Sequence, residues 1–210
     1  MPQKMIAFDL VGTLIAGDAF RDARSSLNLD FNQGWSEAAE KSSFATNFDY
    51  ETVFQALLDA MSPGTLHRQF RAYLVSRVTD YLYPEVCQVL KTLDDQGVRL
   101  GFVTDGSNDV EGEMIKRILD HCGIEPDRCT IVTGQDVGGN KAGGKPFDAL
   151  VAQAKHLGIE RTGVTFVGDN PSADIDGAKI AGLKAILIYR RPDITQHKPD
   201  REITNLLELL

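Results

Sequence analysis

The chain has 210 residues, with a formal net charge of −8 and a pI of about 5.0. Its 42% hydrophobic and 25% charged residues indicate a globular protein, and its acidity argues against nucleic acid or an anionic membrane as a main partner, because both require basic surface. The chain shows no signal-peptide pattern and no apolar run of membrane-spanning length, so we expect a cytoplasmic protein.

A short apolar run at residues 5–8 opens the chain and predicts a strand that is buried on both faces of a parallel sheet. The region that follows contains no convincing strand, and we expect helices there at residues 19–27, 35–40, 50–60 and 65–81. Beyond residue 84, helices alternate with strands. These helices are predicted at residues 85–96, 109–122, 146–157 and 171–181, and the strands at residues 98–103, 129–132, 163–167 and 184–189. Residues 190–199 are predicted to form a loop before a short closing helix.

This alternation predicts an α/β fold, a Rossmann-like three-layer core with a five-stranded parallel sheet. Residues 1–16 and 84–210 are expected to form the core, and residues 17–83 an inserted all-helical cap domain. Within the core, Glu111 and Glu113 are expected on a solvated helix face.

The cysteines Cys87, Cys122 and Cys129 are odd in number and lack CxxC spacing. We therefore predict reduced, mostly buried thiols rather than a disulfide or a metal site.

Polar residues follow several of the predicted strands. Asp9, Thr104 and Asp169 each stand at a strand end, and a Gly-rich loop after another strand carries Lys141 and Lys145. Because the carboxyl ends of parallel strands share one edge of the sheet, these side chains can converge on one pocket. Two carboxylates suit Mg²⁺, and a hydroxyl with an ammonium suits the phosphate oxygens that Mg²⁺ accepts as ligands. Asp9 could then attack phosphorus and form an aspartyl-phosphate.

Four segments of the chain resemble, in order, the motifs of the haloacid dehalogenase (HAD) superfamily. They are FDLVGTL at residues 8–14, FVTDG at 102–106, DVGGNK at 136–141 and VGDNPSADIDGA at 167–178. The resemblance covers nearly the whole chain and implies a hydrolase with a helical C1-type cap inserted after the first strand.

The resemblance also implies a role for each motif residue. Asp9 is the nucleophile and a metal ligand, and Val11 offers a metal ligand through its backbone carbonyl. Asp169 binds Mg²⁺, and Asp174 supports the metal from a second shell or through water. The phosphoryl group is bound by Thr104, Asp105, Gly106 and the motif lysine. The Val-Gly-x-x-Lys register and the distance to Phe147 select Lys141 as that lysine, while Lys145-Pro146 resembles the usual Lys-Pro pair and makes Lys145 the alternative.

Val11 departs from the superfamily pattern. Phosphatases of the superfamily carry a second Asp at this position, which acts as general acid and general base. Valine cannot transfer a proton, and such help contributes about 10²–10⁴-fold to rate. Three explanations remain open. In the first, the substrates have good leaving groups that need no acid. In the second, another side chain replaces the acid, with Asp18, Asp105 or a cap residue as the candidates. In the third, the protein binds phosphate with little or no turnover.

The predicted function is thus a Mg²⁺-dependent phosphatase for a small phosphorylated metabolite. A non-catalytic or weakly active phosphate-binding relative is one alternative. A 2-haloacid dehalogenase is another, because that enzyme also lacks the second Asp, although it needs no Mg²⁺ and the resemblance places Tyr at position 11. The sequence does not indicate the oligomeric state.

Overall fold

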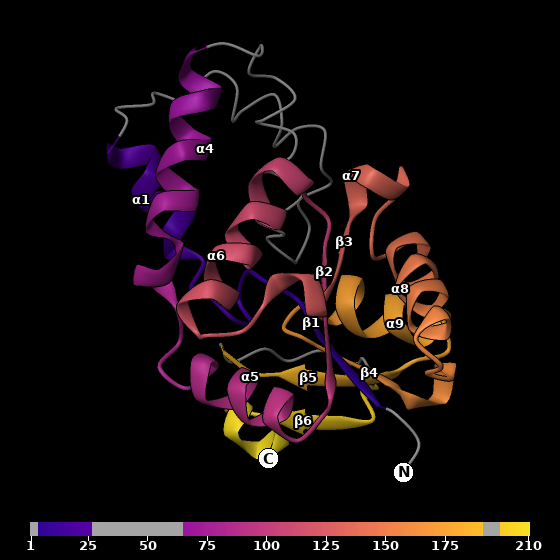
Figure 1. Ribbon diagram of the computed structural model, residues 1–210. Helices are drawn as coiled ribbons and strands as arrows, with labels where there is room; N and C mark the ends of the chain where they lie inside the picture. Colours follow the sequence, from indigo (N-terminus) through magenta and orange to yellow (C-terminus); the bar gives the residue numbers. More distant parts are fainter. Residues whose placement is uncertain (1–3, 27–64, 191–197) are drawn as a thin grey trace.

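The computed structural model describes residues 4–26, 65–190 and 198–210 (Figure 1). The helices predicted at residues 35–40 and 50–60 lie outside these ranges. Within them, no helix combines the length and the apolar character that crossing a membrane requires.

The core is a six-stranded, fully parallel sheet with the strand order β3-β2-β1-β4-β5-β6. The strands are β1 (Met5–Phe8), β2 (Arg99–Thr104), β3 (Thr130–Thr133), β4 (Val164–Gly168), β5 (Lys184–Ile188) and β6 (Arg201–Ile203). The α/β class and the Rossmann-like architecture are confirmed, with one strand more than the five predicted. Strand β6 is only three residues long and buries only Ile203. Its sequence therefore shows no alternation of apolar and polar residues from which a strand could be predicted.

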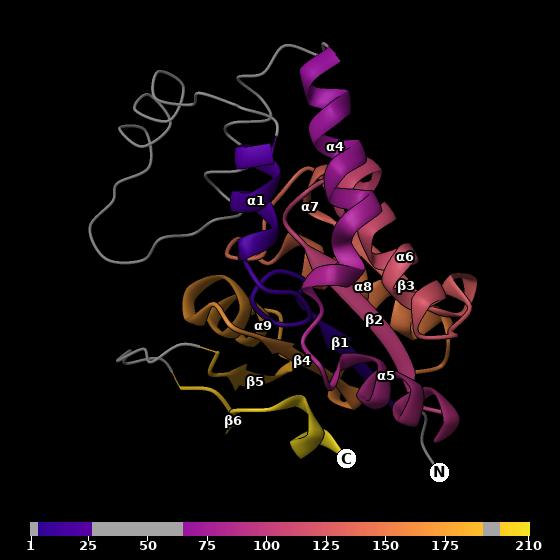
Figure 2. The same cartoon turned by 90° about the vertical axis from the view of Figure 1, so that its left-hand side faces the viewer.

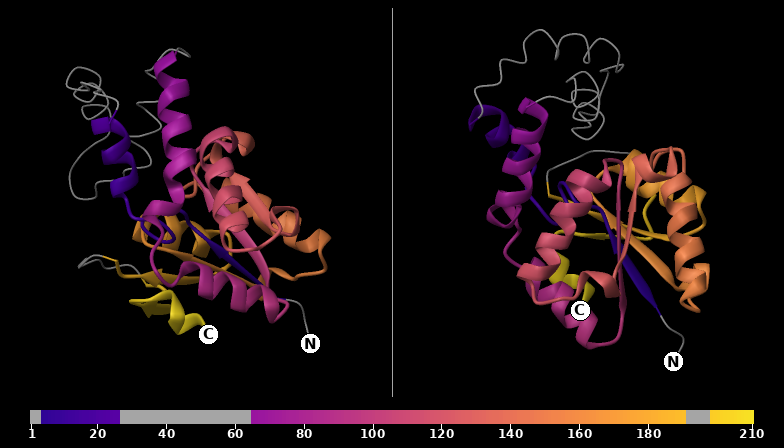
Figure 3. Two further views of the ribbon diagram at one scale, coloured as in Figure 1. Left: turned by 60° about the vertical axis from the view of Figure 1, so that its left-hand side comes forward. Right: turned by 45° about the horizontal axis from the view of Figure 1, so that its top comes forward.

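Helices cover both faces of the sheet (Figures 1 and 3). On one face lie α5 (Val86–Asp95) and α6 (Glu113–His121), and on the other lie α8 (Lys145–His156) and α9 (Gly177–Ile180). Right-handed crossovers force this division, because the strand order runs outward in opposite directions from β1. Each face buries its own hydrophobic cluster, and in the second cluster the rings of Phe147 and Phe166 meet edge to face, with centroids 4.8 Å apart.

Several short helical segments complete the core. They are the 3₁₀ turns Pro126–Arg128, Arg161–Gly163 and Leu206–Leu209, the short α7 (Gly134–Val137), and the π-helical turns Asn108–Gly112 and Pro171–Asp176. The two π-helical turns replace the first turns of the helices predicted at residues 109–122 and 171–181. Such turns are frequent at functional sites.

Two helices of the predicted insert are described, α1 (Asp18–Ser26) and α4 (Thr65–Arg77), the latter followed by the 3₁₀ turn Val78–Tyr81. They pack side by side and project beyond the core (Figure 2). The Tyr81 hydroxyl donates to Asp22 Oδ2 at 3.1 Å, and Arg71 reaches Asp109 of the core at 3.2 Å. Helix α4 therefore contacts the core next to one of the π-helical turns.

The expectation of three reduced thiols is wrong for two of them, because Cys87 and Cys122 form a disulfide. Cys129 is a free thiol. Cys87 lies on α5 and Cys122 follows α6, and the packing of these helices on one face brings the two Cα atoms to 4.9 Å, within the range that a disulfide requires. The separation of 35 residues carries no sign of this proximity.

Candidate functional site

The candidate site lies where the strand order reverses, at the carboxyl end of β1. Asp9 directly follows β1, Thr104 ends β2, and Asp169 follows β4, so the three residues come from adjacent strands. The backbone of Asp9 continues the ladder, with its N–H donating to the carbonyl of Val167 at 2.9 Å. In open α/β sheets, ligands bind at such a reversal point.

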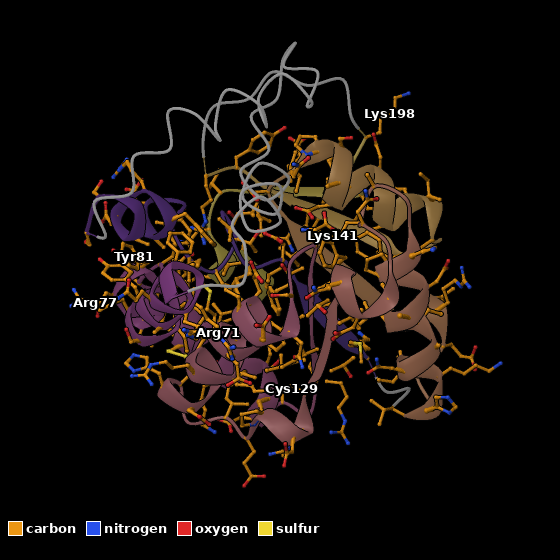
Figure 4. All side chains as sticks on the ribbon, turned by 90° about the horizontal axis from the view of Figure 1, so that it is seen from above. Arg71, Arg77, Tyr81, Cys129, Lys141 and Lys198 are labelled. Atoms are coloured by element: carbon orange, nitrogen blue, oxygen red, sulfur yellow. A yellow bond between two sulfur atoms is a disulfide. The ribbon has the colours of Figure 1, made fainter. Side chains whose placement is uncertain are left out.

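The ammonium group of Lys141 occupies the centre of the site. Its Nζ lies 2.6 Å from Asp9 Oδ1 and 2.8 Å from Asp174 Oδ1. The three side chains are buried, with exposed fractions of 1%, 2% and 0% for Lys141, Asp9 and Asp174. Seen from above in Figure 4, Lys141 lies near the middle of the molecule, whereas Arg77 and Lys198 lie at its rim.

The carboxylates of Asp9, Asp169 and Asp174 form a cluster in which one oxygen of each lies within 4.8 Å of the others. Three carboxyl groups face a single ammonium, that of Lys141, so the acidic groups of the site outnumber the basic one, and a divalent cation would balance them. Carboxylate oxygens are the ligands that Mg²⁺ prefers, and Mg²⁺ is commonly held by one or two of them together with water and substrate phosphate. The residues present therefore fit Mg²⁺.

The turn after Asp9 requires glycine at position 12. Gly12 adopts a φ of +89°, and a Cβ built on it would lie 2.2 Å from Asp169 Oδ2. Any side chain here would push the turn away from the carboxylate cluster. Gly12 thus combines a left-handed backbone with close approach to a site residue.

Asp174 is held by the turn that precedes α9. Its Oδ2 accepts a hydrogen bond from the backbone N–H of Asn170 at 2.9 Å, which complements the ion pair of its Oδ1 with Lys141. The side chain of Asn170 in turn accepts from the N–H groups of Ser172 and Ala173, both at 3.0 Å. This local network explains how Asp174, which lies one turn beyond Asp169 in the chain, joins it in one cluster.

The loop after β2 connects to the lysine loop. The backbone N–H of Lys141 donates to Asp105 Oδ1 at 2.6 Å, and the N–H of Gly106 donates to Thr104 Oγ1 at 3.3 Å. Glu111 lies beneath this loop, fully buried, and accepts from the N–H of Ser107 at 2.7 Å. The expectation that Glu111 lies on a solvated face is therefore wrong, because the π-helical turn directs it inward.

The remaining predicted residues lie apart from the carboxylate cluster or engage other groups. Lys145 begins α8, and its exposed Nζ donates to the carbonyl of Gly138 at 3.0 Å. Val11 is partly buried and packs against the hydrophobic cluster of the α5 and α6 face. Among the suggested replacements for the missing acid, Asp18 is more than half exposed and pairs with Arg21 at 2.9 Å.

Sequence reasoning missed Arg190, a largely buried arginine whose side chain is 9% exposed, which follows β5 and contacts the turn after Asp9. It stands at the start of a polar, Pro-containing segment for which only a loop is predicted. Its partner Thr13 lies 177 positions earlier in the chain, and no spacing rule connects residues so far apart. No sequence signal could therefore have identified Arg190.

Known proteins resemble this chain in sequence and in fold. The family model for haloacid dehalogenase-like hydrolases matches residues 3–182. A phosphoserine phosphatase from Thermus thermophilus is 28% identical over 76% of this chain, which spans 63% of that relative's length. A glyceraldehyde 3-phosphate phosphatase from Pyrococcus abyssi is 31% identical over 87% of this chain and 80% of its own length. The solved structure of a HAD phosphatase from Thermococcus onnurineus has the same fold, with a TM-score of 0.66 and 24% identity over 99% of this chain and 96% of its own.

The match to the family model covers well over half of the chain, and the relatives named above are phosphatases. This chain belongs to the haloacid dehalogenase-like hydrolase family.

Proposed function

We propose that the protein is a Mg²⁺-dependent phosphatase that hydrolyses a small phosphorylated metabolite through an aspartyl-phosphate on Asp9. The observation that carries this proposal is the buried contact of Lys141 with both Asp9 and Asp174, beside the carboxylate of Asp169. A dehalogenase needs no metal, whereas three converging carboxylates suit a divalent cation.

In the first step, an oxygen of Asp9 forms a bond to phosphorus while the bond from phosphorus to the ester oxygen breaks, and the leaving group departs as an oxyanion that takes its proton from water. In the second step, water attacks the aspartyl-phosphate, releases inorganic phosphate and regenerates the Asp9 carboxylate. Lys141 orients Asp9 and, with the hydroxyl of Thr104, bonds the phosphoryl oxygens. Asp9, Asp169 and the backbone carbonyl of Val11 would hold Mg²⁺, with Asp174 supporting it, and the cation would supply positive charge that offsets the charge of the phosphoryl group.

The helical insert, residues 17–83, is proposed to act as the cap that covers this site and selects the substrate. The contact between α4 and the core beside residues 108–112 supports this role, since that turn closely follows Thr104 and Asp105 in the chain. A cover of this kind excludes bulk water from the reacting groups and brings its own side chains against the substrate.

Val11 supports a restriction on the leaving group. It packs against the hydrophobic cluster and cannot donate a proton to the departing oxygen. We therefore expect acyl and aryl phosphates to be better substrates than sugar phosphates, because their leaving groups depart without a general acid. The same residue supports a second candidate function, a protein that binds phosphate with little turnover.

A panel of phosphate esters, assayed with Mg²⁺ and with EDTA and including one 2-haloacid, tests the proposal. We expect phosphate release that requires Mg²⁺ and disappears in the Asp9→Asn variant. Halide release in EDTA would identify a dehalogenase instead. Phosphate release that survives both EDTA and Asp9→Asn would refute the mechanism, and the absence of any release would favour the binding function.

A further inference from the structure

Arg190 joins three parts of the chain near the candidate site. Its Nη2 donates to the backbone carbonyl of Thr13 at 3.0 Å, and its Nη1 pairs with Glu85 Oε1 at 2.7 Å. Its Cζ also lies 3.7 Å from the centroid of the Tyr83 ring. The side chains of Arg190 and Glu85 are only 9% and 6% exposed, so this contact is protected from solvent. A guanidinium makes these contacts through two separate nitrogens and its flat face, a geometry that the compact ammonium of a lysine does not reproduce.

The first contact fixes the turn that carries the nucleophile. Thr13 lies between two backbone hydrogen bonds of that turn, Gly12 N–H to Ile15 carbonyl at 2.8 Å and Leu14 N–H to Leu10 carbonyl at 2.9 Å. Displacement of the Thr13 carbonyl would therefore move the turn. Gly12 contacts Asp169 from within the same turn, and Asp9 closely precedes it.

The other two contacts fix the base of the helical insert. The chain leaves the core after Ile15 and returns at Leu82, and these two residues form an antiparallel bridge. Two backbone hydrogen bonds flank the bridge, Ala16 N–H to Tyr81 carbonyl at 2.9 Å and Tyr83 N–H to Leu14 carbonyl at 3.0 Å. Through Tyr83 and Glu85, Arg190 holds the returning connection, and through Thr13 it holds the outgoing one.

We propose that Arg190 is a positioning residue that anchors both connections of the insert, and the turn after Asp9, to the end of β5. Its contacts keep Asp9 aligned for attack. The role in turnover rests on the proposed phosphatase function, whereas the anchoring itself does not. Thr104 and Lys141, which are proposed to bind the phosphoryl group, belong to the end of β2 and to the loop before α8, whereas the hydrogen bond and the ion pair of Arg190 join other segments. Loss of the anchor should therefore disturb the alignment of Asp9 more than the binding of substrate.

The test compares Arg190→Lys with the matched control Arg161→Lys. Arg161 also donates to a backbone carbonyl, that of Ala181, through a partly buried hydrogen bond. Its side chain is more exposed than that of Arg190, and it precedes β4, at the amino ends of the strands and away from the candidate site. With p-nitrophenyl phosphate and Mg²⁺, Arg190→Lys should lower kcat about 10- to 100-fold and change KM by less than about threefold. Thermal midpoints recorded for both variants show that each is folded at the assay temperature. An equal kcat in both variants, or a loss confined to KM, would overturn the proposal.

Hydrogen exchange keeps the proposal testable if the wild-type protein hydrolyses no phosphate ester. In that case the phosphatase function fails, but the amides of Gly12, Leu14 and Tyr83 should still exchange at least about tenfold faster in Arg190→Lys than in Arg161→Lys. Unchanged exchange at these amides would refute the anchoring role, independently of the activity.

Discussion

Replacement of Lys141 by methionine should destabilise the protein strongly. The substitution keeps the apolar part of the side chain but removes the ammonium that lies 2.6 Å from Asp9 and 2.8 Å from Asp174. Two buried carboxylates would then lose the cation that lies between them. Removing one partner of a buried ion pair costs about 3–5 kcal/mol, and the free energy of unfolding should fall by about this amount in EDTA.

The matched control is Lys145→Met, because Lys145 belongs to the same loop region but has an exposed ammonium that donates to a backbone carbonyl. Its substitution should change the free energy of unfolding by no more than about 0.5 kcal/mol. Urea denaturation in EDTA and in millimolar Mg²⁺ measures both variants. Mg²⁺ should return part of the stability lost in Lys141→Met, since the cation replaces the missing positive charge.

Activity should separate the two lysines equally clearly. With an aryl phosphate, Lys141→Met should reduce kcat by about 10²–10³-fold, whereas Lys145→Met should leave it within about threefold of the wild type. If the two variants lose similar stability and similar activity, the central role assigned to the ammonium of Lys141 is refuted.

Three further predictions concern other regions of the chain. Val11→Asp should raise kcat on sugar phosphates by about tenfold or more, because it supplies a proton donor, and Val11→Asn should give no such gain in the same phosphate-release assay. Reduction of the Cys87–Cys122 disulfide, which joins residues 35 positions apart, should lower the free energy of unfolding by about 4 kcal/mol, measured by urea denaturation with and without dithiothreitol. Burial alone would raise the pKa of Glu85, but hydrogen bonds from its own backbone and from Arg190 lower that pKa overall. The stabilisation by Glu85 is therefore complete above its unfolded pKa and is lost as the pH falls through the lower folded value. The difference in urea midpoint between wild type and Glu85→Gln should accordingly narrow as the pH falls below about 4.3, the ordinary pKa of glutamate.

The succession of strands along the chain and the positions of their polar ends could be predicted from the sequence. The strands at Met5–Phe8 and Val164–Gly168 are largely apolar runs, and each is followed by an aspartate. Strand β2 ends at Thr104. Periodicity and strand ends are local properties, and parallel pairing places all such ends at one edge. The approximate position of the candidate site therefore follows from the amino-acid sequence.

Other features depend on which segments the chain brings together over long distances. The proximity of Cys87 to Cys122, the inward direction of Glu111 and the contacts of Arg190 arise from helix packing, from a π-helical turn and from the end of β5. None of these has a local sequence signal, because each depends on how the surrounding segments pack.

The site itself shows the same division. Residue order alone places Asp9 and Asp169 at strand ends and a lysine in the Gly-rich loop that follows another strand. Motif register favours Lys141 over Lys145, and the packing of the chain separates the two lysines further: Lys141 is buried between two carboxylates, whereas the ammonium of Lys145 is exposed at the start of α8. The physical reason is that loop geometry, which sets the reach of a lysine side chain, depends on the surrounding hydrogen bonds rather than on residue spacing.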